Sequence, residues 1–219
     1  IGERAVIGAT VRLDPGAVIS DDAKVGARAF IGAYCVIGRR CVVGEGCELE
    51  PHCTIGANGF GYATGPDGKH QRVPQVGNVE LAPGVDMGAG CAIDRGAITS
   101  TRIGKGTKLG NLCLIAHNVQ VGHDCMIVGK VAIAGSATMG NNVVLGGNSD
   151  VGGHLHVGDK VQAAAKSGIT RSIPDGQVVR GMPARRFEDV TREMRLVGRL
   201  EDLYSRVAEL ESQIERNKD

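Results

Sequence analysis

Aromatic side chains are scarce in this sequence: they make up 3% of its 219 residues, and tryptophan is absent. Conventional globular cores draw much of their buried area from aromatic rings, so a core of that kind is not expected. Glycine, by contrast, contributes 34 residues, about twice its usual share of roughly 7%. These features favour a narrow interior filled by aliphatic side chains of similar size.

The sequence also has little excess charge and no long apolar run. The formal net charge is +1, which gives no electrostatic reason to expect nucleic acid as the main partner. No stretch approaches the roughly 18–20 apolar residues that span a bilayer, and no signal-peptide pattern opens the chain. We therefore expect neither a transmembrane segment nor secretion, and the seven cysteines, an odd number, favour a reduced, cytoplasmic setting.

An aliphatic residue recurs every six positions along most of the chain. One series runs from Ile1 to Ile55, and a second runs to Ile169. Six residues equal one flat side and one corner of a triangular coil, so three units make an 18-residue turn whose aliphatic side chains point inward. Residues 18 apart should then stack as parallel strands about 4.8 Å apart. The period predicts an all-β parallel β-helix over residues 1–170, and the second series opens in phase with Val79, Val85, Cys91 and Ala97.

A second ladder of small residues stands two positions before the aliphatic one. It includes four cysteines spaced six apart: Cys35, Cys41, Cys47 and Cys53. A zinc site needs four ligands that converge on one point, whereas successive members of this ladder fall on different faces of the prism. Buried cysteine commonly acts as a small hydrophobic residue, so we expect core filling and no metal site.

Two segments depart from the repeat. Residues 57–78 keep its phase but lose the aliphatic positions, which predicts a long excursion from the prism; loops of that length are usually functional or disordered. After Ile169 the repeat ends in a capping segment at 171–186. Residues 187–219 then place apolar residues at alternating steps of four and three, which predicts a coiled-coil-like helix. Its seam consists of Leu196, Leu200, Leu203, Val207, Leu210 and Ile214.

Histidines are the clearest candidates for acid–base chemistry. His117 precedes Asn118 at the end of a repeat, and Gly135 stands 18 residues after it, one coil above. His154 lies one coil further up, over Ser136. A histidine beside a stacked glycine places a proton acceptor next to a backbone N–H that can approach a substrate oxygen. Spacing alone equally allows these histidines to be solvated surface residues.

A set of short motifs occurs in order along the chain. They are Gly56-Ala-Asn-Gly-Phe-Gly-Tyr-Ala63, Pro74-Gln75-x-Gly77, Ile93-Asp-Arg-Gly-Ala97, Ile115-Ala-His-Asn-Val119, Ala134-Gly-Ser136, Gly153-His154 and Gly181-Met-Pro-Ala184. Together they resemble the UDP-3-O-acylglucosamine N-acyltransferase family of the lipid A pathway in Gram-negative bacteria. The resemblance covers essentially the whole chain and implies a left-handed β-helix assembled as a homotrimer.

The resemblance also implies a role for each matching residue. His117 would be the general base, Gly135 the backbone donor to the oxyanion and His154 a second active-site histidine. The donor would be a 3-hydroxyacyl thioester on the phosphopantetheine of acyl-carrier protein, with no further cofactor and no metal. The acceptor would be the 2-amine of a UDP-3-O-acyl-glucosamine, held between neighbouring subunits. Substrate-binding residues would be Asn118, Asp94, Phe60 and Tyr62.

The chain departs from the family in three respects. The family usually has Asp at the position of Gly110, where it is thought to orient the catalytic histidine, and a polar residue at the position of Leu114. We expect Gly110→Asp to be tolerated unless another acid, such as Asp94, already serves His117. The family also carries an N-terminal uridine-binding domain. Because it is not found here and residue 1 is Ile rather than Met, we expect either a fragment or a different recognition of the nucleotide.

Residues 171–199 contain seven arginines and four acidic residues, so basic side chains are in excess in this stretch. Acyl-carrier proteins are strongly acidic, so such a patch would steer their encounter. We expect Arg185, Arg186 and Arg192 to contribute to docking, with an ordinary solvated helix face as the alternative.

Three other functions stay open at this point. An acetyl-CoA-dependent sugar acetyltransferase shares the expected fold, and Gly110 leaves room for a non-catalytic paralogue or scaffold. A γ-type carbonic anhydrase would need zinc-bound histidines. His117 and His123 are six residues apart, however, and should point in different directions.

Overall fold

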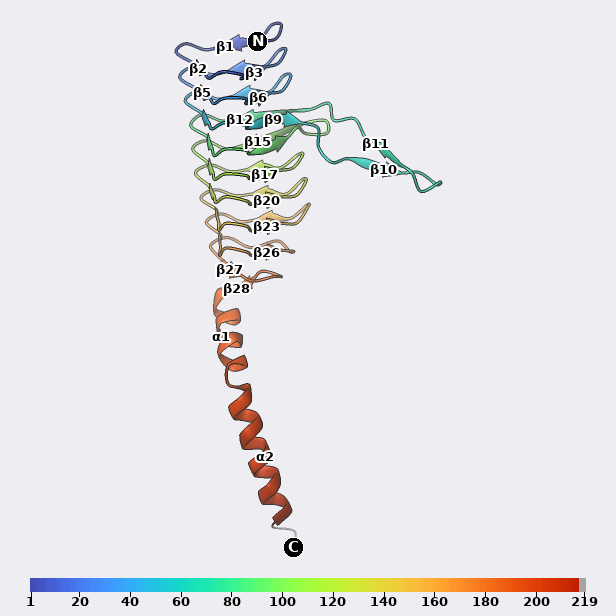
Figure 1. The fold of residues 1–219 in the computed structure, drawn as a ribbon, viewed down its shortest axis with the longest axis vertical. Coiled ribbons are helices and arrows are strands. Elements are labelled where there is room, and N and C mark those ends of the chain that lie inside the picture. Colours follow the sequence, from blue (N-terminus) through green and yellow to red (C-terminus); the bar gives the residue numbers. More distant parts are fainter. Residues whose placement is uncertain (217–219) are drawn as a thin grey trace.

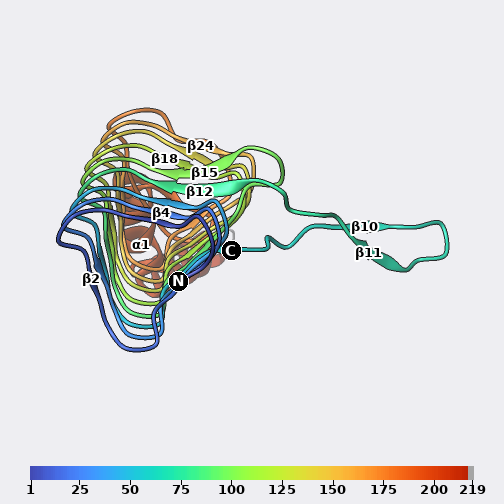
Figure 2. The same cartoon turned by 90° about the horizontal axis from the view of Figure 1, so that it is seen from above.

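A computed structural model describes residues 1–216 as a three-sided prism that continues into a helical stalk (Figure 1). Short strands on each side of the prism pair in parallel with the same side of the neighbouring coils. Seen from above, the coils superimpose as a triangle from which one hairpin projects (Figure 2). This is the left-handed parallel β-helix predicted from the repeat and the resemblance.

Each side of the prism is one sheet. The first side contains β1 (Val6–Ile7), β4 (Lys24–Val25), β7 (Val42–Val43), β12 (Asn78–Leu81), β15 (Ser100–Ile103), β18 (Gln120–Val121), β21 (Thr138–Met139) and β24 (His156–Val157). The second side contains β2 (Arg12–Leu13), β5 (Phe30–Ile31), β8 (Glu48–Leu49), β13 (Asp86–Met87), β16 (Lys108–Leu109), β19 (Met126–Ile127), β22 (Val144–Leu145), β25 (Gln162–Ala163), β27 (Val178–Arg180) and the antiparallel β28 (Arg185–Arg186). The third side contains β3 (Val18–Ile19), β6 (Val36–Ile37), β9 (Thr54–Ala57), β14 (Ala92–Asp94), β17 (Leu114–Ile115), β20 (Ala132–Ile133), β23 (Asp150–Val151) and β26 (Gly168–Ile169).

The interior of the prism is a stack of aliphatic side chains. In the two-residue strands other than β26 and β28 the second residue points inward and the first points outward, as in β17, where Ile115 is fully buried and Leu114 is 45% exposed. Backbone hydrogen bonds join the coils: the N–H of Leu114 donates to the Val131 carbonyl at 2.9 Å, and that of Ala116 donates to the Ile133 carbonyl at 2.9 Å. The same contacts repeat in every coil, so burial and backbone pairing are satisfied together.

The cysteine ladder fills the core, as predicted. All seven cysteines are free and buried, and several thiols donate to backbone carbonyls of the next coil, such as Cys53 to Gly88 at 3.2 Å. Burial raises the pKa of the Cys41, Cys47 and Cys125 thiols, which disfavours the reactive thiolate.

The predicted phase of the repeat is wrong between residues 57 and 97. Ile55 pairs with Ile93, and Ile93 in turn pairs with Ile115, so both of these coils are longer than 18 residues. The inward positions there lie two residues later than predicted, at Leu81, Met87 and Ile93, whereas Val79, Val85 and Cys91 are buried in the ladder of small residues and Ala97 lies outside the strands.

Two insertions explain the error. Residues 57–77 leave the prism and shift the phase of the next strands by two positions. A short segment at 95–99, between β14 and β15, shifts it by four more. Because the two shifts add to one full repeat, the series regains its original phase at Ile103, and the sequence period alone conceals both.

The excursion forms a β-hairpin. Its strands β10 (Tyr62–Thr64) and β11 (His70–Arg72) pair antiparallel and extend away from the prism (Figures 1 and 2). The chain leaves the third side after β9 and returns to the first side at β12.

The C-terminal region is helical but interrupted. Where one helix is expected, the structure has α1 (Phe187–Val197) and α2 (Leu200–Arg216), separated at Gly198. The seam residues from Leu196 to Ile214 are between 43% and 57% exposed. Residues 217–219, the end of the predicted helix, lie outside the described residues. In the part of the chain that the structure describes, no helix combines the length and apolarity needed to cross a membrane.

The alternation of inward and outward residues makes a direct prediction for stability. Ile115→Ala should lower the free energy of unfolding by about 2–5 kcal/mol, because it empties a packed position. Leu114→Ala, one residue away on the outer face, should change it by less than about 0.5 kcal/mol. Guanidinium denaturation of both variants measures the difference. Equal losses would contradict the assigned facing of β17.

Candidate functional site

The two insertions and the predicted catalytic residues share one corner of the prism. At this corner, here called the loop corner, the chain passes from the third side to the first. Successive coils place there the segments 57–77, 95–99, 117–118, 135–136 and 153–154. The regular backbone therefore stacks the predicted site directly beneath the two irregular segments.

His117 is half-buried at the loop corner, against the glycine of the next coil. A methyl group on Gly135 would lie 2.7 Å from His117 Cε1 and 2.8 Å from its Nε2. Only glycine allows so close an approach, because any other side chain would displace the ring. The structure thus brings His117 and Gly135 together, as the sequence predicts.

Asn118 fixes the tautomer of His117. Its Oδ1 accepts a hydrogen bond from the backbone N–H of Ala97 at 3.0 Å and lies 3.1 Å from His117 Nδ1. Since an N–H can only donate, that amide atom is oxygen, and Nδ1 must carry the proton that it shares with Asn118. A neutral His117 therefore keeps an unprotonated Nε2, which lies on the Gly135 side of the ring.

Further contacts hold Asn118 itself. Its backbone N–H donates to Thr101 Oγ1 at 2.9 Å, and its Nδ2 donates to Thr99 Oγ1 at 3.2 Å. The insertion at 95–99 thus supplies the groups that orient the amide, which in turn orients the imidazole.

Asp94 is the acid of the site. It ends β14, and its neighbour Ile93 pairs with Ile115, which places Asp94 beside the residues that lead into His117. Burial raises the pKa of Asp94 to about 6, while the positive charge of His117 opposes that rise. Asp94 therefore lies where its carboxylate can compensate a positive charge that develops on the ring.

The position of Gly110 cannot accommodate the side chain of an acid that would orient His117. A methyl group at this position would lie 2.4 Å from the backbone nitrogen of Gly129, so an Asp would force the corner apart. Gly110 also follows β16, at the opposite end of the third side from His117. The expectation that Gly110→Asp is tolerated is therefore wrong on steric grounds, and Asn118 and Asp94 are the groups that serve His117.

The excursion loop returns over the site. A methyl group on Gly59 would lie 2.8 Å from His117 Cβ and 3.1 Å from Gln75 Oε1. Arg95, which is 8% exposed, ties both ends of the loop to the prism. Its Nε donates to the Gly56 carbonyl at 2.9 Å, and its Nη1 donates to the Gly77 carbonyl at 3.1 Å. These bonds hold the loop where it meets His117.

The remaining predicted residues lie further out. His154 occupies the same corner two coils from Asn118; its backbone N–H donates to the Gly135 carbonyl at 3.1 Å, and its side chain is exposed. Phe60 and Tyr62 project with the hairpin, their ring centroids 5.0 Å apart, and line a surface hollow of about 470 Å³. The structure therefore groups His117, Gly135, Asn118 and Asp94, and leaves His154, Phe60 and Tyr62 exposed further from them.

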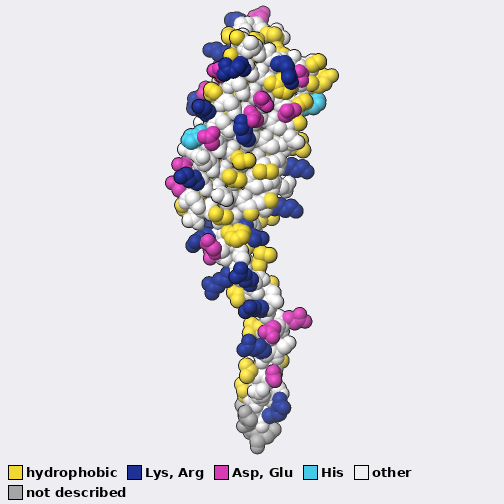
Figure 3. Space-filling model, turned by 90° about the vertical axis from the view of Figure 1, so that its left-hand side faces the viewer, with side chains coloured by type: hydrophobic (Ala, Val, Ile, Leu, Met, Phe, Trp, Pro, Cys, Tyr) yellow, Lys and Arg dark blue, Asp and Glu magenta, His cyan; other side chains and the backbone are white. Residues whose placement is uncertain are grey.

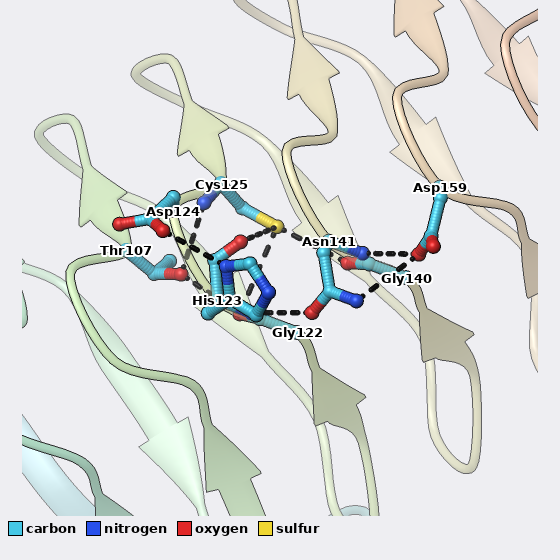
Figure 4. Close-up of polar contacts among 8 residues, drawn as sticks. All are labelled: Thr107, Gly122, His123, Asp124, Cys125, Gly140, Asn141 and Asp159. Carbon is cyan, nitrogen blue, oxygen red and sulfur yellow. Dashed lines mark hydrogen bonds and ion pairs between the residues drawn. The ribbon is translucent and has the colours of Figure 1, made fainter.

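His123 belongs to a different corner. Its Nδ1 lies 2.8 Å from Asp124 Oδ2, and its backbone N–H donates to Asn141 Oδ1. The backbone N–H of Asn141 in turn donates to Asp159 Oδ1 (Figure 4). This ladder of side-chain oxygens caps successive coils. His117 and His123 of this chain therefore do not converge on one point, and no group of three or more potential ligands that could hold a metal occurs within residues 1–216.

The predicted docking arginines are partly neutralised. Arg185 forms a two-point ion pair with Glu193, one contact of which is 2.6 Å, and Arg186 pairs with Glu188 at 2.9 Å. Arg192 has no ion pair within the described residues. Lys and Arg side chains nevertheless gather where the prism meets the helix (Figure 3).

Sequence reasoning missed Gly59, Gln75, Arg95 and Thr99 as members of the site. Gly59 and Gln75 lie in motifs that the resemblance already contained, but the pattern could not show that the loop folds back onto His117. Arg95 also lies in a motif of the resemblance, but Arg95 and Thr99 both belong to the short insertion, which the restored phase of the repeat concealed.

Comparisons with known proteins show which sequences and structures this chain is similar to. The family model for the bacterial transferase hexapeptide (six repeats) matches residues 4–39 and 29–58. A UDP-3-O-acylglucosamine N-acyltransferase of Anaeromyxobacter dehalogenans (strain 2CP-C) is 47% identical over 119 residues, which are 52% of this chain and 34% of that protein. Its counterpart in Rhizobium meliloti (strain 1021) is 45% identical over 146 residues, 67% of this chain and 41% of that protein.

A solved structure shares the fold. A UDP-N-acetylglucosamine acyltransferase from Campylobacter jejuni superimposes with a TM-score of 0.73 at 20% identity, over 85% of this chain and 71% of that one. These findings confirm the fold and the resemblance noted in the sequence. The matched region spans only about a third to two fifths of the length of the two curated relatives.

The raised pKa of Asp94 predicts how its removal changes stability with pH. In the unfolded chain an Asp titrates near 3.9, whereas the folded chain holds the proton up to a pKa of about 6. The folded state thus binds more protons between these values, and its stability falls as pH rises through them. Asp94→Asn should remove this loss, so its gain in melting temperature over the parent should grow from pH 4 to 6 and stay constant above.

Asp150→Asn removes an exposed acid from the same side of the prism and serves as the control. A gain for Asp94→Asn that did not depend on pH would contradict the assignment of a buried, proton-binding carboxyl.

Proposed function

We propose that this chain, a homologue of the UDP-3-O-acylglucosamine N-acyltransferases, transfers a 3-hydroxyacyl group from acyl-carrier protein to the 2-amine of a UDP-3-O-acyl-glucosamine in lipid A synthesis. One observation carries the proposal: Asn118 holds His117 in the tautomer with a free Nε2, and that nitrogen lies against Gly135. A proton acceptor beside a closely approachable backbone is what acyl transfer requires.

The reaction follows from this geometry. The amine nitrogen attacks the thioester carbonyl carbon, and His117 Nε2 takes one amine proton as the C–N bond forms. The resulting imidazolium is stabilised by Asp94 nearby and by the Asn118 amide oxygen on Nδ1. The C–S bond then breaks, and the proton passes from Nε2 to the leaving thiolate.

The backbone at Gly135 stabilises the negative charge that develops on the thioester oxygen. Its missing side chain lets the substrate oxygen come close to the backbone, where an N–H can donate to the oxyanion; loss of such a donor typically reduces the rate about 10²–10³-fold. The exposed side chains of His154, Phe60 and Tyr62 are proposed to contact the substrate.

The proposal includes assembly and location. The exposed seam of α1 and α2 is suited to contact with copies of itself, and a homotrimer would bring neighbouring prisms to the loop corner. A cytoplasmic setting, expected from the cysteines, belongs to the same proposal.

An acetyl-CoA-dependent acetyltransferase would use the same histidine, so a comparison of acyl-carrier-protein and CoA donors separates the two functions.

His117→Ala should lower kcat/KM for acyl transfer by about 10²–10⁴-fold, because it removes the base. Gly135→Ala should cause a loss of similar size, because the added methyl displaces the ring. Both variants should keep melting temperatures close to that of the parent, since neither side chain fills the core. The assay combines acyl-carrier-protein thioester with the UDP-amino sugar.

His123→Ala, at the neighbouring corner, is the matched control and should retain activity. Activity of His117→Ala within threefold of the parent would remove His117 as the base.

The basic region makes a separate prediction. Reversal of Arg185, Arg186 and Arg192 to Glu should weaken binding of acylated carrier protein, with Arg192 dominant because it alone lacks an ion pair within the described residues. Binding by the parent should also weaken as salt is raised above physiological strength, where the Debye length is about 8 Å.

Three reversals at the other end of the prism, Lys24, Arg28 and Arg39 to Glu, control for net charge. Equal binding by both triple variants and the parent would place the docking surface elsewhere.

A further inference from the structure

Gln75 presents an unused hydrogen-bond acceptor beside the site. It lies on the returning limb of the excursion loop, where its Nε2 donates to the Val73 carbonyl at 3.3 Å. That bond sets the orientation of the amide, because the opposite orientation would set two oxygens against each other. Its Oε1 is buried and has no hydrogen-bond partner within residues 1–216. Native structures rarely leave such an atom unpaired, so a water molecule or a ligand is expected to supply the missing donor.

This oxygen lies close to the catalytic imidazole. A methyl group on Gly59 would touch both, at 3.1 Å from Gln75 Oε1 and 2.9 Å from His117 Cδ2. A methyl group on Gly61 would lie 2.8 Å from Gln75 Nε2. The two glycines therefore let the loop backbone pass close to the Gln75 amide, and Gly59 also lets it pass close to the His117 ring. Arg95 secures the loop in that position.

We propose that Gln75 Oε1 accepts a hydrogen bond from the attacking amine and so selects an amine over a hydroxyl as the acyl acceptor. The inference rests on the proposed function. A primary amine has two N–H bonds and one lone pair. His117 Nε2 takes one hydrogen, and an acceptor for the second holds the lone pair toward the thioester. Gln75 is neutral, so it orients the amine without competing for its proton.

A hydroxyl acceptor cannot satisfy both groups. It has a single hydrogen, which goes to His117, and its oxygen lone pairs would then face Gln75 Oε1. The buried oxygen would stay unpaired in the transition state, and a site of this kind discriminates against the ligand that lacks the donor. The same scaffold without this acceptor would accept a hydroxyl more readily.

The test compares two acceptors, UDP-3-O-acyl-glucosamine and its analogue with a hydroxyl at position 2, using acyl-carrier-protein thioester as donor. Gln75→Leu should lower kcat/KM for the amine by about 10- to 100-fold, the usual effect of losing a buried hydrogen bond. It should leave transfer to the hydroxyl unchanged or faster, so the preference for the amine falls. Gln75→Asn keeps a neutral acceptor oxygen and should lower the preference less than Gln75→Leu does. Gln71→Leu makes the same change at an exposed position of the same loop and should match the parent.

The outcomes distinguish a failure of the proposed function from a failure of the inference about Gln75. A parent that transfers no acyl group to either acceptor would overturn the proposed function, and this inference with it. A parent that is active while Gln75→Leu keeps the parental amine preference would overturn this inference alone, including when both acceptors lose activity equally. A loss in Gln75→Leu that disappears with a donor lacking its 3-hydroxyl would also overturn it, because the oxygen would then bind the acyl chain.

Discussion

Backbone pairing between consecutive coils is the constraint on which the rest of this molecule depends. Each coil donates to the next through bonds such as Leu114 to Val131, at 2.9 Å, and those bonds form only if each coil presents its strands in the same register. The inward aliphatic residue, the small residue two positions earlier and the corner all follow from that register. A coil can lengthen only where no pairing is lost, which is at a corner.

Both lengthened coils use the same corner, and that choice creates the site. The excursion at 57–77 and the insertion at 95–99 leave the sheets intact, yet they place irregular backbone over the regular corner that carries His117. The insertion supplies Ala97 and Thr99 to orient Asn118, and the excursion supplies Gly59 and Gln75. The regular prism contributes rigidity, and the interruptions contribute the polar groups that a uniform repeat lacks.

The sequence predicted the prism well because its signal is repeated many times, so that one irregular position hardly weakens it. The pairing of His117 with Gly135 followed from the same register. The positions of the insertions were predicted wrongly because their two phase shifts add up to one full repeat. A sequence period does not reveal two shifts that together restore the original phase. The contacts of Asn118, Arg95 and Gln75 were out of reach for a different reason: they depend on how irregular backbone folds back, which no spacing rule fixes. The expectation about Gly110 failed because backbone packing against Gly129, invisible in the sequence, excludes a side chain there.

The neutral Asn118 and the ionisable Asp94 act on His117 in different ways, which explains how the loop corner can function with a single acid. Asn118 fixes the tautomer without holding a charge, so it leaves Nε2 free in the resting state. Asp94, which burial keeps prone to protonation at mildly acidic pH, gains a favourable partner only when the imidazole becomes positive. Its charge is therefore better compensated during proton transfer than before it, and an interaction that strengthens along the reaction is the kind that accelerates it. A carboxylate bonded directly to Nδ1 would instead stabilise the imidazolium at rest, and the base would more often be occupied.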